Sequence, residues 1–233
     1  MSENNVENTK EPKENAFLNI GLNVILPSVI LTKLSGDQHL GQVYSLILAL
    51  SFPIGYGLYD YIKMKKFNFF SGLGLFSVLM TGGIGLFQLD KSWMVAKETG
   101  IPLIMGLAVL YSQFTQYPLV KLFLGQMIDI ELIDKTFKEK GHDGLFEKNL
   151  RIASFLLACT FFISAILNYV LAVKVLVGEP GSEEFNQSLG KMTALSFPVI
   201  SVPMVIMVGV IIAYLVMTIK KNTDLEIESI IKQ

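Results

Sequence analysis

The sequence has few of the residues that usually build sites in soluble proteins. It contains one cysteine, Cys159, and two histidines, His39 and His142, in 233 residues. A single cysteine excludes a disulfide within the chain. The two histidines are far apart along the chain, so they do not form a metal-ligand spacing. We therefore expect no metal site and no cofactor.

Motifs for catalysis and for nucleic-acid binding are also missing. The sequence shows no Ser/His/Asp set, no glycine-rich phosphate loop with a lysine, and no cluster of metal ligands. We expect no catalytic residues and a protein that is not an enzyme. No basic face stands out, so we expect no nucleic-acid partner.

Charge is scarce and clumped. Charged residues make up 17% of the chain and hydrophobic residues 52%, and the mean hydropathy is +0.51. A soluble domain would carry charge on about a quarter of its residues. Long apolar windows separate the charged groups, which is the pattern of a chain whose solvent is lipid. The sequence predicts an all-α polytopic membrane helix bundle.

Six apolar segments are long enough to predict transmembrane helices, arranged as three hairpins. They cover about residues 16–34, 40–62, 69–89, 100–124, 152–177 and 192–219. Residues 1–15 are polar and lack the basic start of a cleaved signal, so we expect a retained, disordered N-terminus. Residues 129–151 predict an amphipathic segment, broken at Gly141–Gly144, on the membrane or against the bundle. Turn residues predict a loop over 177–190, and residues 220–233 form a short tail.

The basic residues predict the orientation. With six spans, 14 of the 19 lysines and arginines lie on the side of the two termini, and five lie on the other side. Because cytoplasmic loops are enriched in lysine and arginine, both termini are predicted to be cytoplasmic, in a bacterial inner membrane.

An internal repeat relates the first and third hairpins. The pentapeptide Ala49–Pro53 recurs as Ala194–Pro198, at an offset of 145 residues. At the same offset, Leu22-Asn23 matches Leu167-Asn168 without a gap. Both copies would start on the cytoplasmic side, which predicts a parallel repeat with the hairpin of residues 81–125 between the two copies.

The repeat aligns two rows of polar residues on helix faces. The candidate residues are Asn19, Asn23, Ser164 and Asn168. They could line a polar path or a ligand pocket between the two repeat hairpins. Alternatively, they form interhelical hydrogen bonds that hold the bundle together. The sequence leaves both interpretations open.

Two further groups of charged residues are candidates. Asp90, Trp93, Lys97 and Glu98 are predicted at the outer tip of the middle hairpin, where they could bind a charged headgroup or could cap and anchor the next helix. Asp60 is predicted at the cytoplasmic interface beside three lysines. It is either a carboxylate that carries protons or a surface ion pair.

The middle of the chain resembles a known family. Gly82-Gly83, Asp90, Trp93 and Lys97 are followed by Ser112-Gln113 and Pro118-Leu119. This order and spacing resemble the bacterial intracellular septation protein A family, over about residues 81–172. The resemblance implies a multi-span inner-membrane protein linked to septation and the cell envelope. Glu98 departs from the family pattern, which usually has proline there, and the cytoplasmic segment is larger.

Two functions therefore remain from the sequence. The first is a non-enzymatic inner-membrane protein of the septation-A type that acts in cell-envelope maintenance through membrane lipids or membrane proteins of division or cell-wall synthesis. The alternative is a small transporter or channel with a polar path between the repeat hairpins. A homodimer is compatible with both.

Overall fold

The computed structural model describes residues 20–64, 69–115 and 118–230. Within these ranges every regular element is helical, so the all-α prediction is confirmed. The elements are η1 (Gly21–Ile25), α2 (Leu26–Leu34), α3 (Gly41–Met64), α4 (Phe69–Leu86), α5 (Ser92–Ser112), α6 (Leu119–Met127), α7 (Ile130–Glu139), α8 (Leu145–Val175), α9 (Glu183–Ser196), η2 (Phe197–Ser201), α10 (Val202–Thr223) and α11 (Ile227–Ile230). Asn19 and the N-terminal segment 1–15 lie outside the described residues.

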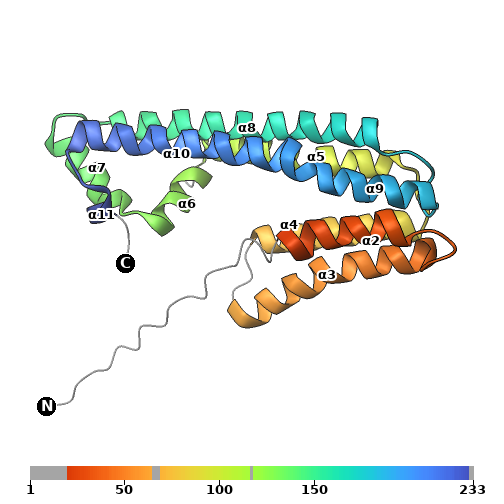
Figure 1. Cartoon of the computed structure of the whole chain (residues 1–233). Coiled ribbons are helices and arrows are strands. Elements are labelled where there is room, and N and C mark those ends of the chain that lie inside the picture. The colour runs from red at the N-terminus through yellow and green to blue at the C-terminus, as the bar shows by residue number, and fades with distance from the viewer. Residues whose placement is uncertain (1–19, 65–68, 116–117, 231–233) are drawn as a thin grey trace, which may run out of the picture.

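Two long rods run side by side along the molecule (Figure 1). One is α8, and the other is the continuous run α9–η2–α10. Helices α2 and α3 lie along one half of these rods, and α6, α7 and α11 lie at the opposite end. The described helices therefore form a bundle whose two halves have different partners.

Among the residues that the structure describes, four helices are long and apolar enough to cross a membrane. They are Gly41–Tyr59, Ser92–Ser112, Leu145–Val175 and Glu183–Thr223. Gly21–Leu34 and Gly72–Leu86 are apolar but shorter. At 1.5 Å per residue, α8 is about 46 Å long, so it exceeds the ~30 Å hydrocarbon core of a bilayer. Large apolar side chains such as Ile104, Ile166 and Val205 are exposed on the outside of the bundle, as lipid contact requires.

The predicted fourth span, residues 100–124, is divided in the structure. Helix α5 begins at Ser92 and ends at Ser112, and α6 is a separate helix that begins after Pro118. The start is early because the Asp90 carboxylate accepts a hydrogen bond from the Ser92 backbone N–H at 2.8 Å. The division follows from Pro118, which has no N–H to continue a helix.

The last rod also begins earlier than predicted. The turn residues predict a loop over residues 177–190, but α9 starts at Glu183. The Ser182 hydroxyl caps this helix by accepting from the Phe185 N–H, and two glutamates occupy its first turn, where the helix dipole favours them. The rod then continues through η2 to Thr223, so the span predicted over 192–219 is part of a 41-residue helical run.

Three connections meet at one end of the bundle. Gly36, in the connection between α2 and α3, lies against the Glu183 carboxylate at the start of α9. Gly181, in the connection between α8 and α9, lies close to the turn between α4 and α5, since a Cβ on Gly181 would lie 2.8 Å from the Gln88 side chain. These are the three connections that the sequence predicts on one side of the membrane. Their proximity agrees with a hairpin order of the helices.

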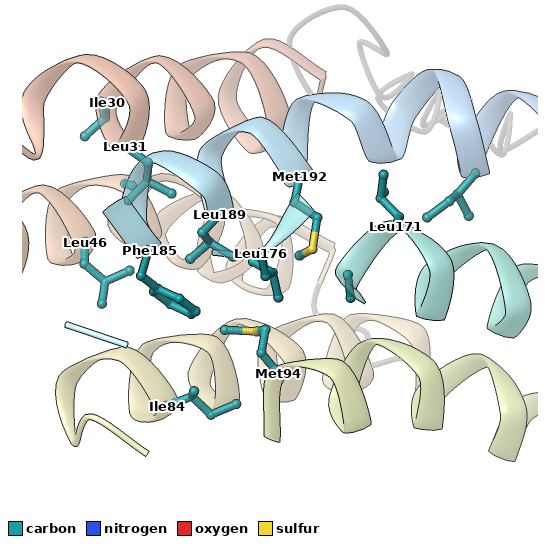
Figure 2. Close-up of a cluster of buried hydrophobic side chains, with 13 residues drawn as sticks. Ile30, Leu31, Leu46, Ile84, Met94, Leu171, Leu176, Phe185, Leu189 and Met192 are labelled. Atoms are coloured by element: carbon teal, nitrogen blue, oxygen red, sulfur yellow. The ribbon is translucent and has the colours of Figure 1, made fainter. Parts of the chain in front are cut away.

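Apolar side chains form two separate clusters along the bundle. The first joins α2, α3, α4, α5, α8 and α9, and Figure 2 shows Phe185 and Leu189 of α9 beside Leu176 and Met94. The second joins α5, α6, α7, α8 and α10 at the other end. On α5 the first cluster includes Met94 and the second begins at Val109. The part of α5 between Met94 and Val109 therefore contributes no buried side chain to either apolar cluster.

The amphipathic segment packs against the bundle. Ile133 and Phe137 of α7 are 0% and 1% exposed, and the Phe137 and Phe146 rings lie 5.5 Å apart between centroids. Gly141 and Gly144 both have positive φ in the turn before α8. Helix α7 is thus fixed by its apolar face, and its lysines remain at the surface.

The two copies of the repeated pentapeptide differ in local structure. Helix α3 continues through Pro53, whereas Pro198 lies inside the π-helical segment η2. Both π-helical segments end just before another proline, Pro27 and Pro203, whose missing N–H is accommodated by the wider turn. The repeat remains a prediction from the sequence.

Close approach of α2 and α9 at Gly190 gives a test of the packing. A Cβ at Gly190 would lie 2.9 Å from the Ser28 backbone oxygen and from the Leu31 Cβ. We expect Gly190→Ala to cost about 1–3 kcal/mol of unfolding free energy, measured by thermal unfolding of the detergent-purified chain. Gly209→Ala is the matched control, because nothing lies within 4 Å of its Cβ position. Equal stability of the two variants would contradict this packing.

Candidate polar cleft

A lysine is buried inside the bundle. Lys97, in the second turn of α5, has a side chain that is 3% exposed. Its Nζ donates to the Thr81 Oγ1 at 2.8 Å and to the Ser77 Oγ at 3.3 Å, and it lies 2.6 Å from the Glu98 Oε1. An ammonium has three N–H donors, so these three acceptors satisfy it.

Helix α4 provides the hydroxyls through a row of small residues. Ser77, Thr81 and Gly85 recur at four-residue spacing and so lie along one side of α4. The Thr81 hydroxyl donates to the Ser77 carbonyl at 3.0 Å, which leaves its oxygen free to accept from Lys97. One turn further on, a Cβ at Gly85 would lie 2.5 Å from Leu46 of α3. The row thus allows close packing on α3 and holds the cation of α5.

A cleft of about 380 Å³ adjoins this ion pair. Its walls come from α4, α5 and α8, and it is open at the surface of the bundle. Its lining residues are Leu73, Gly74, Ser77, Glu98, Ile101, Pro102, Met105, Phe161, Ser164 and Asn168. The volume lies in the range of small-molecule sites, about 300–1,000 Å³. The cleft occupies the stretch between the two apolar clusters.

The polar groups of the cleft are mainly acceptors. Glu98 contributes a carboxylate, of which Lys97 holds one oxygen. Pro102 has no N–H, so the backbone carbonyl of Glu98 cannot receive the usual i+4 hydrogen bond. The Asn168 amide N–H donates to the Ser164 carbonyl at 2.8 Å and weakly to the Ser164 hydroxyl, and these bonds do not use its amide oxygen. A ligand that carries N–H or O–H donors fits this arrangement.

The structure brings together only some of the residues that the sequence singles out. Ser164 and Asn168 line the cleft with Glu98. Asn23 lies in η1 and is not part of the lining, so the two polar rows do not meet in this cleft. Asn19 and the side chain of Asp60 lie outside what the structure describes.

The predicted charged tip separates into two environments. Asp90 and Trp93 are exposed at the start of α5, and hydrogen bonds from the Ser92 side chain and backbone lower the pKa of the Asp90 carboxyl below its usual 3.8. Lys97 and Glu98, by contrast, pack inward against α4 and the cleft. Glu98 is six residues beyond the start of α5, so it lies too far along to act on the helix dipole.

Sequence reasoning missed the partners of Lys97. The small residues Ser77, Thr81 and Gly85 favour close helix contact, but nothing local in the sequence indicates that the two hydroxyls pair with a lysine 16–20 residues later. A hydroxyl pair at four-residue spacing, facing a lysine across a short hairpin, was the available signal. In the part of the chain that the structure describes, no group of three His, Cys, Asp or Glu side chains could hold a metal ion.

A second buried polar cluster joins the hairpins at the loop end. The Ser35 and Ser45 hydroxyls lie 2.8 Å apart, and Asn186 donates to the Gln42 carbonyl at 2.7 Å. Asn186 is 0% exposed. These hydrogen bonds of Asn186 tie α9 to α3.

Comparison with protein-family models, with curated proteins and with solved structures finds no match. The class that the structure defines is a helical protein whose described residues include four helices long and apolar enough to cross a membrane, with a polar cleft between α4, α5 and α8.

Removal of Lys97 alone should destabilise the bundle. Lys97→Met would leave the Glu98 carboxylate without its cation, so we expect a loss of about 2 kcal/mol in unfolding free energy. The double variant Lys97→Met/Glu98→Gln removes both charges and should recover most of that loss. Thermal unfolding in detergent measures both, with Lys91→Met, at an exposed lysine, as the control. An unchanged midpoint for Lys97→Met would show that the pair does not stabilise the fold.

Proposed function

We propose that this chain is a non-enzymatic integral membrane protein of the septation-A type that acts in cell-envelope maintenance by binding a membrane lipid. The cleft would take the polar part of the lipid, and the acceptors on Glu98 and Asn168 favour a headgroup with amine or hydroxyl donors. The observation that carries the proposal is the acceptor-lined cleft among apolar helices. A charged group in such surroundings is costly and is usually functional.

The family resemblance and the cleft involve the same part of the chain. Lys97, Glu98, Ser164 and Asn168 all lie within residues 81–172. Glu98, however, stands where the family usually has proline. The envelope role is therefore proposed from the resemblance, and the carboxylate of the cleft is proposed as an addition of this chain.

Membrane location and partners are part of the same proposal. We place the protein in the bacterial cytoplasmic membrane with six spans and both termini in the cytoplasm, as the distribution of lysine and arginine favours. The exposed polar face of α7 is a surface on which membrane proteins of division or cell-wall synthesis could dock, and the apolar outer faces leave room for a homodimer.

Glu98→Gln tests the lipid-binding function. The change keeps size and acceptor oxygen but removes the charge, so headgroup affinity should fall about tenfold. In a strain without the native gene, Glu98→Gln and the charge-neutral double variant Lys97→Met/Glu98→Gln, which avoids an unpaired buried lysine, should both fail to restore cell length and septation, and the double variant should reach the membrane at normal level. Glu184→Gln, at an exposed glutamate of α9, is the matched control and should restore both. Full restoration by Glu98→Gln would contradict the proposal.

Transport is a second candidate, because Ser164 and Asn168 of α8 line a cleft, and α8 packs against a helical run that contains the π-helical segment η2 with Pro198. Interrupted helices are common at transporter sites. In a Cys159→Ala background, Asn168→Cys should then react with charged thiol reagents from both faces of the membrane. Ile166→Cys, on an exposed apolar position, is the control and should stay unreactive. Labelling from one face alone would contradict alternating access.

A further inference from the structure

A second polar cavity lies at the other end of the α5–α8 pair. It has a volume of about 220 Å³ and is formed where α5 ends, where α6 begins and by the first turns of α8. Its polar lining includes Gln113, Lys121, Glu147, Arg151 and Ser154. None of these residues lines the cleft that holds Glu98. The two cavities are therefore separate sites.

The charge of this cavity is positive. Lys121 of α6 and Arg151 of α8 provide two cations, and Glu147 provides one carboxylate. Among the residues that the structure describes, neither Lys121 nor Arg151 has a carboxylate oxygen within 4.0 Å, although five other pairs do. An anion that reached the cavity would therefore meet cations that are not already neutralised.

The cavity lies at the boundary between polar and apolar chain. Arg151 is the last charged residue of α8 before an uncharged run that extends to Val173. Pro118 and Leu150 add an apolar edge to the lining. In the orientation that the basic residues predict, this boundary is the cytoplasmic interface, where basic pockets between helices bind lipid phosphates.

We propose that this cavity binds a phosphate group, supplied by the headgroup of an anionic phospholipid. The Arg151 guanidinium offers a planar fork that matches two phosphate oxygens, and the Lys121 ammonium adds a point charge. The Gln113 amide supplies a neutral donor. The apolar edge suits the glycerol and acyl part of a lipid, which a free phosphate lacks.

Native mass spectrometry of the full-length protein, released from micelles, tests this site. The probes are phosphatidylglycerol, phosphatidylcholine and inorganic phosphate. Phosphatidylglycerol should bind in preference to phosphatidylcholine, and Lys121→Gln/Arg151→Gln should weaken its binding about tenfold. Lys148→Gln/Lys221→Gln is the matched control, because it removes two exposed lysines, one in the first turn of α8 and one in the last turn of α10, and neither lines the cavity.

The outcomes distinguish a specific binding site from attraction by general surface charge. If the control double variant retains lipid binding and the cavity double variant loses it, the result supports the site. Competition by millimolar inorganic phosphate would support recognition of the phosphate group, whereas inorganic phosphate that binds more tightly than phosphatidylglycerol would overturn the lipid as its source. Equal losses in both pairs, or no preference for the anionic lipid, would overturn it. If the double variant does not fold, Arg151→Gln should lose binding and Arg151→Lys should retain part of it. Unchanged binding in Arg151→Gln would also overturn the proposal.

Discussion

The coordination of one ammonium group constrains the centre of this bundle. Lys97 lies between apolar helices, where an unsatisfied charge would be very costly. Its three acceptors come from two helices, since Ser77 and Thr81 belong to α4 and Glu98 belongs to α5. Helix α4 can deliver both hydroxyls only by lying close to α5, and the small side chains of its row permit that approach. Local packing therefore follows from the need to satisfy a buried charge.

The ion pair also explains why the apolar core is interrupted. Between Met94 and Val109, α5 turns Lys97, Glu98 and Pro102 toward its neighbours, so the two apolar clusters cannot join there. Close packing resumes at Gly106, where a Cβ would lie 2.7 Å from the Phe162 ring of α8. The cleft is thus bounded on one side by a satisfied charge and on the other by a tight helix contact.

Hydropathy could predict the long helices. The apolar surface of a run such as Ile152–Val173 avoids water only when the run is a helix surrounded by lipid or protein. The start of α5 could not be found in this way. Taken alone, Lys97 and Glu98 indicate a surface turn, and their burial depends on hydroxyls 16–20 residues earlier in the chain.

The start of α9 had a local signal in Ser182, Glu183 and Glu184, but glycines and a proline nearby favoured a loop. The repeat offset aligned Asn23 with Asn168, but a shared register does not place two residues in one cavity.

The cleft at Glu98 and the cavity at Arg151 share the packed pair of helices α5 and α8 and differ in the helix that forms their third wall. Both have walls from α5 and α8, which the close approach at Gly106 holds together. The third wall of the cleft is α4, and its polar link to α5 is the Lys97 ammonium. Hydrogen bonds from one flexible side chain yield more easily than a close-packed helix contact. If the cleft changes width when a headgroup binds, we expect α4 to move and the α5–α8 pair to stay fixed, so that Lys97 sets how far the cleft opens.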